Sequence, residues 1–144
     1  MWDKNDLIPQ GEIEVKVTRK SVDFAERFGK HLGSDKKEVD PRNGREKITE
    51  AKLTTSQLRK FFGEVKRQQM EGYDETRFIL LKPKLAYAVG RAKDQKSKIN
   101  DFYLVIANAI DRVKDKDQFK HFIQIFEAIV AYHKAAEENM KINN

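Results

Sequence analysis

The chain has 144 residues, and no stretch approaches the ~20 consecutive apolar residues of a membrane-spanning helix. It contains no cysteine, which excludes disulfides, zinc–thiolate sites and thiol catalysis. Hydrophobic residues make up 39% and charged residues 36%, and nine Phe, four Tyr and one Trp can fill the core of one domain. We therefore expect a single domain over residues 1–144, located in the cytoplasm and not in a membrane.

The N-terminal third gives the weakest structural signals. Residues 1–17 show only a short polar–apolar alternation over 12–17, so we expect an extended or disordered arm. Apolar residues at helical spacing over 22–32 predict a first helix that Gly33 ends. Residues 34–47 contain one apolar side chain, Val39, and two turn-forming dipeptides, which indicates a mobile loop.

Residues 48–140 are expected to form the helical core. The apolar periodicity predicts four further helices, over 54–71, 74–92, 99–113 and from 115 or 117 to about 140. Pro83 should kink the third helix or split it at Lys82, and Asp101 should lie on the outer side of the fourth. The predicted fold class is all-α: a compact bundle of about five helices with a flexible N-terminal arm.

Two predicted helices are apolar on more than one side. The side chains that lie outside the main apolar stripes are Ile79 and Leu80 on the third helix, and Ile125, Ala128 and Tyr132 on the fifth. A small bundle has few surfaces to cover such helices, so we expect docking or self-association through these residues, including a homodimer of the isolated protein.

The net charge of +6 is concentrated in the middle of the chain. Residues 51–100 hold 12 Lys and Arg against 5 Asp and Glu, whereas the segments on either side are close to neutral. A local positive potential of this kind attracts polyanions, which favours nucleic acid or an anionic surface as the partner.

The cations of this segment follow helical faces. The second predicted helix places four residues on one face: Arg59, Gly63, Lys66 and Arg67. The third does the same with Lys84, Tyr87 and Arg91, and Lys93 follows. An ordinary solvated face remains an alternative, as does close packing of Gly63 against a neighbouring helix and burial of the Tyr87 ring.

Signals for catalysis are weak. The three histidines, His31, His121 and His133, show no metal-binding spacing, and no glycine-rich phosphate loop is present. Acidic pairs such as Glu137 and Glu138 are better explained as solvated helix ends. We expect no enzymatic activity, no cofactor and no metal site.

Three segments resemble one known family. Residues 53–62 (LTTSQLRKFF) and 84–91 (KLAYAVGR) are similar to two signatures of the small subunit of the type III-A CRISPR Csm effector complex. Residues 119–134, which include EAIVAY, resemble its C-terminal helix. The resemblance covers about residues 48–134.

This resemblance implies a non-enzymatic structural subunit of an antiviral ribonucleoprotein. Copies of such a subunit stack along the inner filament with other Csm subunits and bind the backbone of guide and target RNA without reading sequence. Arg59 and Arg91 match the motif arginines and would contact RNA. Lys52 and Lys60 flank the first motif, while Lys66, Lys84 and Lys93 are RNA-binding candidates from the basic faces alone.

Two other interpretations remain open at this stage. One is a helical protein–protein adaptor whose basic face meets an acidic partner. The other is a helix-turn-helix DNA-binding protein with its turn at Glu71 and Gly72, although the following helix is too apolar for a recognition helix.

Overall fold

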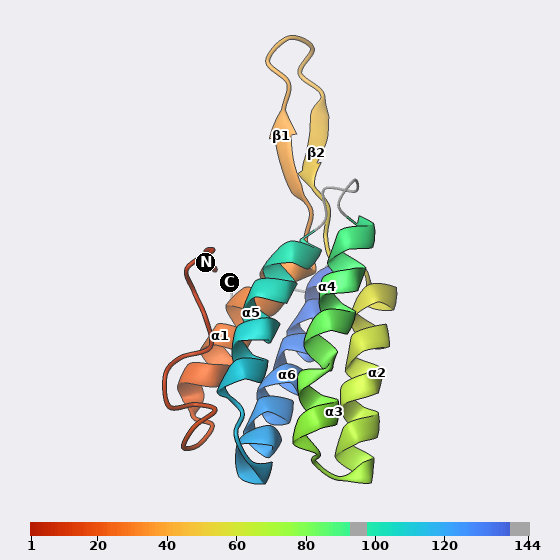
Figure 1. Ribbon diagram of the computed structural model, residues 1–144. Coiled ribbons are helices and arrows are strands. Elements are labelled where there is room, and N and C mark those ends of the chain that lie inside the picture. Colours follow the sequence, from red (N-terminus) through yellow and green to blue (C-terminus); the bar gives the residue numbers. More distant parts are fainter. Residues whose placement is uncertain (93–97, 139–144) are drawn as a thin grey trace.

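The computed structural model describes residues 1–92 and 98–138 of the chain. Its helices pack side by side, and a two-stranded hairpin projects from one end (Figure 1). In chain order the elements are α1 (Arg19–Leu32), β1 (Lys36–Val39), β2 (Glu46–Glu50), α2 (Thr55–Glu71), α3 (Glu75–Ile79), α4 (Leu81–Ala92), α5 (Ile99–Arg112) and α6 (Lys116–Glu137). Apart from the short α3, each described helix has 12 or more residues. The predicted helical bundle is confirmed.

Two glycines let α1 and α6 pack at close range. A Cβ atom added to Gly29 would lie 2.6 Å from the Tyr132 Cβ and 2.8 Å from the Ile129 carbonyl oxygen. A Cβ added to Gly33 would lie 2.6 Å from the carbonyl oxygen of His133. These distances are shorter than any side chain tolerates, so both positions require glycine if the helices are to keep this separation.

The core is rich in aromatic side chains. Phe24 and Phe28 of α1 are fully buried, as are Phe122 and Phe126 of α6. Neighbouring rings meet edge to face or tilted, as in the Phe122–Phe126 pair with centroids 5.8 Å apart. Helix α6 contributes much of this core, because it has buried apolar residues in every turn over residues 119–129.

The long apolar segment at 74–92 is split, as predicted, but at Leu80 and not at Lys82. Pro83 occupies the first turn of α4, where its missing N–H leaves no intrahelical hydrogen bond unmade. Because the proline ring would clash with the carbonyl of residue 79 in a continuous helix, the break falls upstream of the proline. Residue 80 then serves as the C-cap of α3.

The prediction of an extended or disordered arm at residues 1–17 is wrong. Trp2, Ile8 and Ile13 are buried in the main core, and the chain between them forms turns. The Trp2 ring packs 4.9 Å from Phe28, measured between ring centroids. The buried residues of this segment lie in turns and are irregularly spaced in the sequence. They therefore show neither helical nor strand periodicity, and a prediction from periodicity misses their burial.

Buried charge fastens this N-terminal segment. The Glu12 carboxylate accepts hydrogen bonds from the backbone N–H groups of Thr18 and Ser21 at the start of α1. Burial alone would raise the pKa of the Glu12 carboxyl group. The hydrogen bonds from these N–H groups and from the hydroxyls of Thr18 and Ser21 outweigh burial, so the pKa is lowered overall. Arg112 of α5 donates to Glu14 at 2.8 Å and to the Ile8 carbonyl at 2.7 Å. Hydrogen bonding from Arg112 lowers the pKa of Glu14 to about 2.

Residues 34–47 were predicted as a loop, and most of them form the hairpin β1–β2 instead. The strands are antiparallel, with Lys37 opposite Ile48 and Val39 opposite Glu46. Between them, the Gly44 N–H donates to the Asp40 carbonyl at 2.8 Å, with Gly44 at a φ of 69°. The hairpin forms through backbone hydrogen bonds and turn residues and buries few apolar side chains. A prediction based on the number of apolar residues therefore misses it. The expected mobility of the segment stays a prediction.

The apolar residues set aside for self-association divide into two groups. Ile125 is buried, and Ala128 and Tyr132 pack against the core. The second apolar side of α6 is therefore covered within the chain, and that part of the prediction is wrong. Ile79 and Leu80 are 45% and 51% exposed, so only these two remain available for a partner.

The close packing of α1 on α6 predicts a large penalty for any side chain at Gly29. Gly29→Ala should lower the free energy of unfolding by about 2 kcal/mol or more, because helix backbones must separate. Gly63→Ala is the matched control, since Gly63 lies in α2 with nothing within 4 Å of an added Cβ. It should stabilise the protein by about 0.5–1 kcal/mol. Urea denaturation of both variants checks this, and equal effects would contradict it.

The Arg112–Glu14 contact predicts acid sensitivity. A carboxyl group whose pKa is lowered from 4.5 to about 2 on folding stabilises the protein above pH 4.5, and this stabilisation disappears as pH falls towards 2. Arg112→Met should cost about 2 kcal/mol at pH 7 and make the fall in stability between pH 4.5 and 2 shallower. Urea unfolding followed by the fluorescence of the single tryptophan, Trp2, measures both.

Lys82→Met serves as the control for this experiment. Lys82 pairs with Asp111 at 2.7 Å on the surface, so its loss should cost less than about 1 kcal/mol. An acid transition that is identical in Arg112→Met and in the unmodified protein would contradict the assignment.

Candidate nucleic-acid interface

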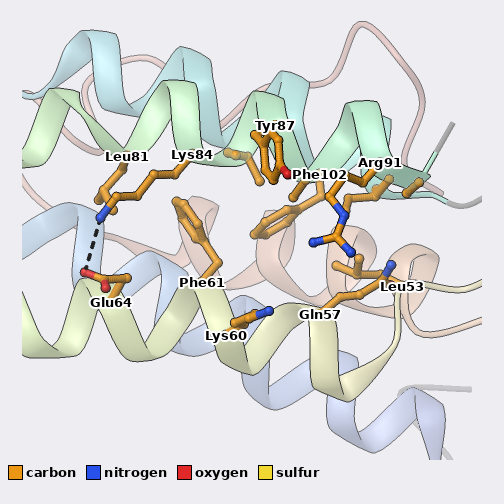
Figure 2. Close-up of a pocket in the computed structure, with 14 residues that line it drawn as sticks. Leu53, Gln57, Lys60, Phe61, Glu64, Leu81, Lys84, Tyr87, Arg91 and Phe102 are labelled. Carbon is orange, nitrogen blue, oxygen red and sulfur yellow. Dashed lines mark ion pairs between the residues drawn. The ribbon is translucent and has the colours of Figure 1, made fainter.

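A groove of about 540 Å³ runs between α2 and α4 (Figure 2). Its floor is apolar and includes Phe61, Leu85 and Phe102. Its rim carries Lys60 from α2 and Lys84 and Arg91 from α4. The groove therefore brings together three of the seven cations that the sequence singled out.

The rim cations differ in how far protein groups neutralise them. The Lys84 ammonium lies 4.0 Å from the Glu64 carboxylate, a long ion pair between an exposed lysine and a half-buried glutamate. The Arg91 guanidinium lies over the Tyr87 ring, 5.8 Å from its centroid. Within the described residues, neither Lys60 nor Arg91 forms an ion pair with a carboxylate. Positive charge is thus available at the rim for an anionic ligand.

Tyr87 is the exposed aromatic of this groove, with 69% of its surface accessible. The alternative of a buried core aromatic is therefore wrong. Figure 2 shows its ring standing beside Arg91 on α4. An exposed aromatic next to a guanidinium is a combination that can contact both the sugar and the phosphate of a nucleic acid.

Arg59 and Lys66 occupy α2 but do not line the groove. Lys66 pairs with Glu127 of α6 at 3.1 Å and lies 5.9 Å from the Phe62 ring centroid. Arg59 is exposed and, two turns before Lys66, belongs to the same flank of α2. Gly63, between them, packs against no neighbouring helix, so that alternative is wrong as well. The two motif arginines, Arg59 and Arg91, consequently face different surfaces.

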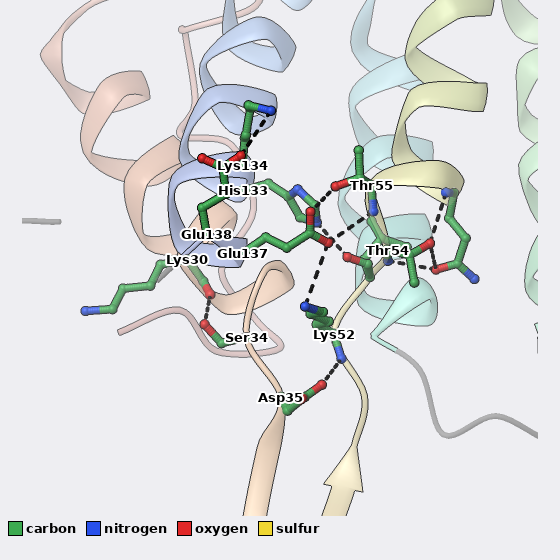
Figure 3. Close-up of polar contacts among 12 residues, drawn as sticks. Lys30, Ser34, Asp35, Lys52, Thr54, Thr55, His133, Lys134, Glu137 and Glu138 are labelled. Atoms are coloured by element: carbon green, nitrogen blue, oxygen red, sulfur yellow. Dashed lines mark hydrogen bonds and ion pairs between the residues drawn. The ribbon is translucent and has the colours of Figure 1, made fainter. Parts of the chain in front are cut away.

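Lys52 belongs to a structural network at the start of α2 (Figure 3). Its ammonium lies 3.9 Å from the Glu137 carboxylate, which also accepts hydrogen bonds from the backbone N–H and hydroxyl of Thr55. Burial raises the pKa of Glu137, but the Thr55 bonds and the neighbouring His133 and Lys52 lower it overall. Glu137 was expected to be a solvated helix end, and it joins α6 to α2 instead.

The remaining candidate, Lys93, lies outside the described residues. Sequence reasoning also missed the acids that neutralise Lys66 and Lys52, because Glu127 and Glu137 come from α6, some 60 to 85 residues away in the chain. A linear charge count does not include such partners. A helical-face argument correctly placed Lys84, Tyr87 and Arg91 together, since it depends on local geometry.

A comparison with models of protein families identifies the family of this chain. The family model described as Csm2 Type III-A matches residues 16–139. The chain belongs to the Csm2 type III-A family. Members of this family are structural subunits of the type III-A CRISPR Csm complex, and the family is not a known catalytic one.

The other comparisons add no relatives. Neither the curated proteins nor the solved structures yield a match. Within the part of the chain that the structure describes, none of the helices has the length and apolar character needed to cross a membrane. The match to Csm2 agrees with the resemblance of residues 53–62, 84–91 and 119–134 and extends it to residue 16.

The network around Glu137 predicts a structural effect. Glu137→Ala should lower the free energy of unfolding by about 1–2 kcal/mol, because Thr55 and Lys52 lose their acceptor. Glu138→Ala is the matched control, since Glu138 is exposed and, among the described residues, its carboxylate pairs with Lys134 of its own helix at 3.3 Å. That change should cost less than about 0.5 kcal/mol. Chemical denaturation of the two neighbours compares them, and similar losses would contradict the network's role.

Proposed function

We propose that this Csm2 family member binds the backbone of guide and target RNA along the inner filament of the type III-A complex, without reading base sequence. The observation that carries the proposal is the groove between α2 and α4, whose rim presents Lys60, Lys84 and Arg91. Its partners would be the RNA, the other Csm subunits and further copies of itself, all in the cytoplasm.

The chemistry of the rim fits backbone contacts. Lys and Arg donate to phosphate oxygens whatever the base, which a subunit serving any guide sequence requires. An A-form duplex hides its base edges in a deep, narrow groove and exposes its phosphates and 2′-hydroxyls. Each copy can bind weakly, because neighbouring subunits of the complex supply avidity.

Six of the seven candidate residues lie in the described part of the chain, and their surroundings rank them as follows, while Lys93 stays a candidate from the sequence alone. Lys60, Lys84 and Arg91 become the principal proposed RNA contacts. Arg59 remains a candidate on the second flank of α2, where it is exposed. Lys52 and Lys66 are ion-paired with α6, so their loss should affect stability as well as binding.

Salt dependence tests the proposal. For the purified chain and unrelated single-stranded RNAs, log K should fall linearly with log salt, with a slope of about −0.7 per phosphate contacted. Arg91→Ala should weaken binding to every RNA about five- to tenfold and reduce the slope by about one contact. Lys114→Ala, an exposed lysine between α5 and α6, is the matched control and should change neither quantity.

Two results would reject the proposal. One is unchanged affinity in an Arg91→Ala, Lys84→Ala double variant that folds normally. The other is a preference of about tenfold or more for one RNA over its scrambled counterpart.

The apolar floor of the groove favours a second candidate, a helical adaptor for an acidic protein. Phe61, Leu85 and Phe102 could receive apolar anchors of a partner helix. Such a partner would occupy the same groove as the RNA. Binding of an acidic amphipathic helical peptide that persists at high salt, by a chain that shows no measurable affinity for RNA, would favour the adaptor.

A further inference from the structure

Three donor side chains from distant segments converge at the root of the hairpin. His31 lies in the last turn of α1, Glu50 ends β2, and Asp101 lies in the first turn of α5. One donor atom from each lies within 4.8 Å of the other two. The sequence predicted no metal site, because its histidines lack motif spacing, yet spacing along the chain says nothing about a cluster that the tertiary fold assembles.

Burial makes this cluster unusual. Asp101 was expected on the outer side of its helix, but only 2% of its surface is exposed. Its carboxylate lies 2.8 Å from His31 Nε2. A buried carboxylate needs a charged or hydrogen-bonding partner, and a second carboxylate close by increases that need.

Glu50 is that second carboxylate, and it is half-buried. Within the described residues, its side chain accepts no hydrogen bond and forms no ion pair. Its oxygens therefore retain their capacity to coordinate a cation. The neutral imidazole and two carboxylates form a donor set of the kind that Zn²⁺ binds, with a fourth position left for water.

We propose that His31, Glu50 and Asp101 bind a divalent transition-metal ion, best represented by Zn²⁺, which fastens the hairpin to the bundle. Zinc bonds of about 2.0–2.2 Å at tetrahedral angles hold neighbouring donor atoms about 3.4 Å apart, so His31 Nε2 and the Asp101 carboxylate, now 2.8 Å apart, would separate slightly to admit the ion. A cavity of about 400 Å³, lined by Trp2, His31 and Lys98 among others, gives access from the side of the N-terminal segment.

Lys98 is the cation that now faces the cluster. It is buried, and its ammonium donates to the His31 carbonyl at 2.7 Å. Burial lowers the pKa of Lys98, while Glu50, Asp101 and Asp35 oppose that decrease and Lys36 adds to it. A metal ion at the cluster would share the negative charge of Glu50 and Asp101 with this ammonium.

Calorimetric titration of the untagged full-length chain with ZnCl₂ at pH 7.5 tests the site. We expect a dissociation constant of about 10 µM or tighter, and an increase in melting temperature of about 4 °C or more in excess zinc.

Two matched pairs of variants assign the ligands. Glu50→Gln and His31→Ala should each weaken zinc binding about tenfold or more. Glu46→Gln, on the same strand, and His121→Ala, whose ring contacts the Ile13 carbonyl, should leave the constant unchanged. Glu50→Gln changes no apolar packing, so it tests the site even if His31→Ala unfolds.

Binding by the unmodified chain weaker than about 10 µM, or a loss below tenfold in Glu50→Gln, would overturn the proposal. Neither result bears on RNA binding, which depends on other residues. The two proposals therefore fail separately.

Discussion

The contact of α1 with α6 fixes the rest of this fold. At Gly29 and Gly33 the two helices approach so closely that a methyl group would collide with backbone atoms of α6. This separation leaves α6 covered by α1 on one side and by the aromatic core on the other. The long helix α6 therefore lies at the centre of the bundle. Its second apolar side, which the sequence indicated as a surface for a partner, packs within the chain.

The central position of α6 also decides which cations stay available. Glu127 and Glu137 project from α6 towards α2 and hold Lys66 and Lys52. The groove on the far side of α2 faces α4, whose described residues include no acid. Tertiary structure thus sorts the positive charge of residues 51–100: Lys52 and Lys66 are paired with acids of α6, whereas Lys60, Lys84 and Arg91 line a groove whose acidic lining residue is Glu64. This sorting is the physical basis for preferring Lys60, Lys84 and Arg91 as the proposed RNA contacts.

Much of this architecture could be predicted from sequence where the signal was periodic. The helices over 54–71 and 99–113 follow from apolar spacing, and the capping box of Thr54 and Gln57 marks the start of α2. The N-terminal segment could not be predicted, because Trp2, Ile8 and Ile13 pack from turns without a period. The hairpin was missed since its stability comes from backbone pairing. Glu50, His31 and Asp101 gave no joint signal, because the fold alone brings them together.

The proposed function places the groove between α2 and α4 against RNA in the assembled complex. The most direct measurement replaces Tyr87 with a photo-crosslinking benzophenone amino acid and irradiates complexes assembled on several unrelated guides. Leu104, 41% exposed on α5, provides the control position. The account predicts crosslinks from position 87 to RNA with every guide, and few from position 104. Crosslinks from position 87 to protein alone would contradict it.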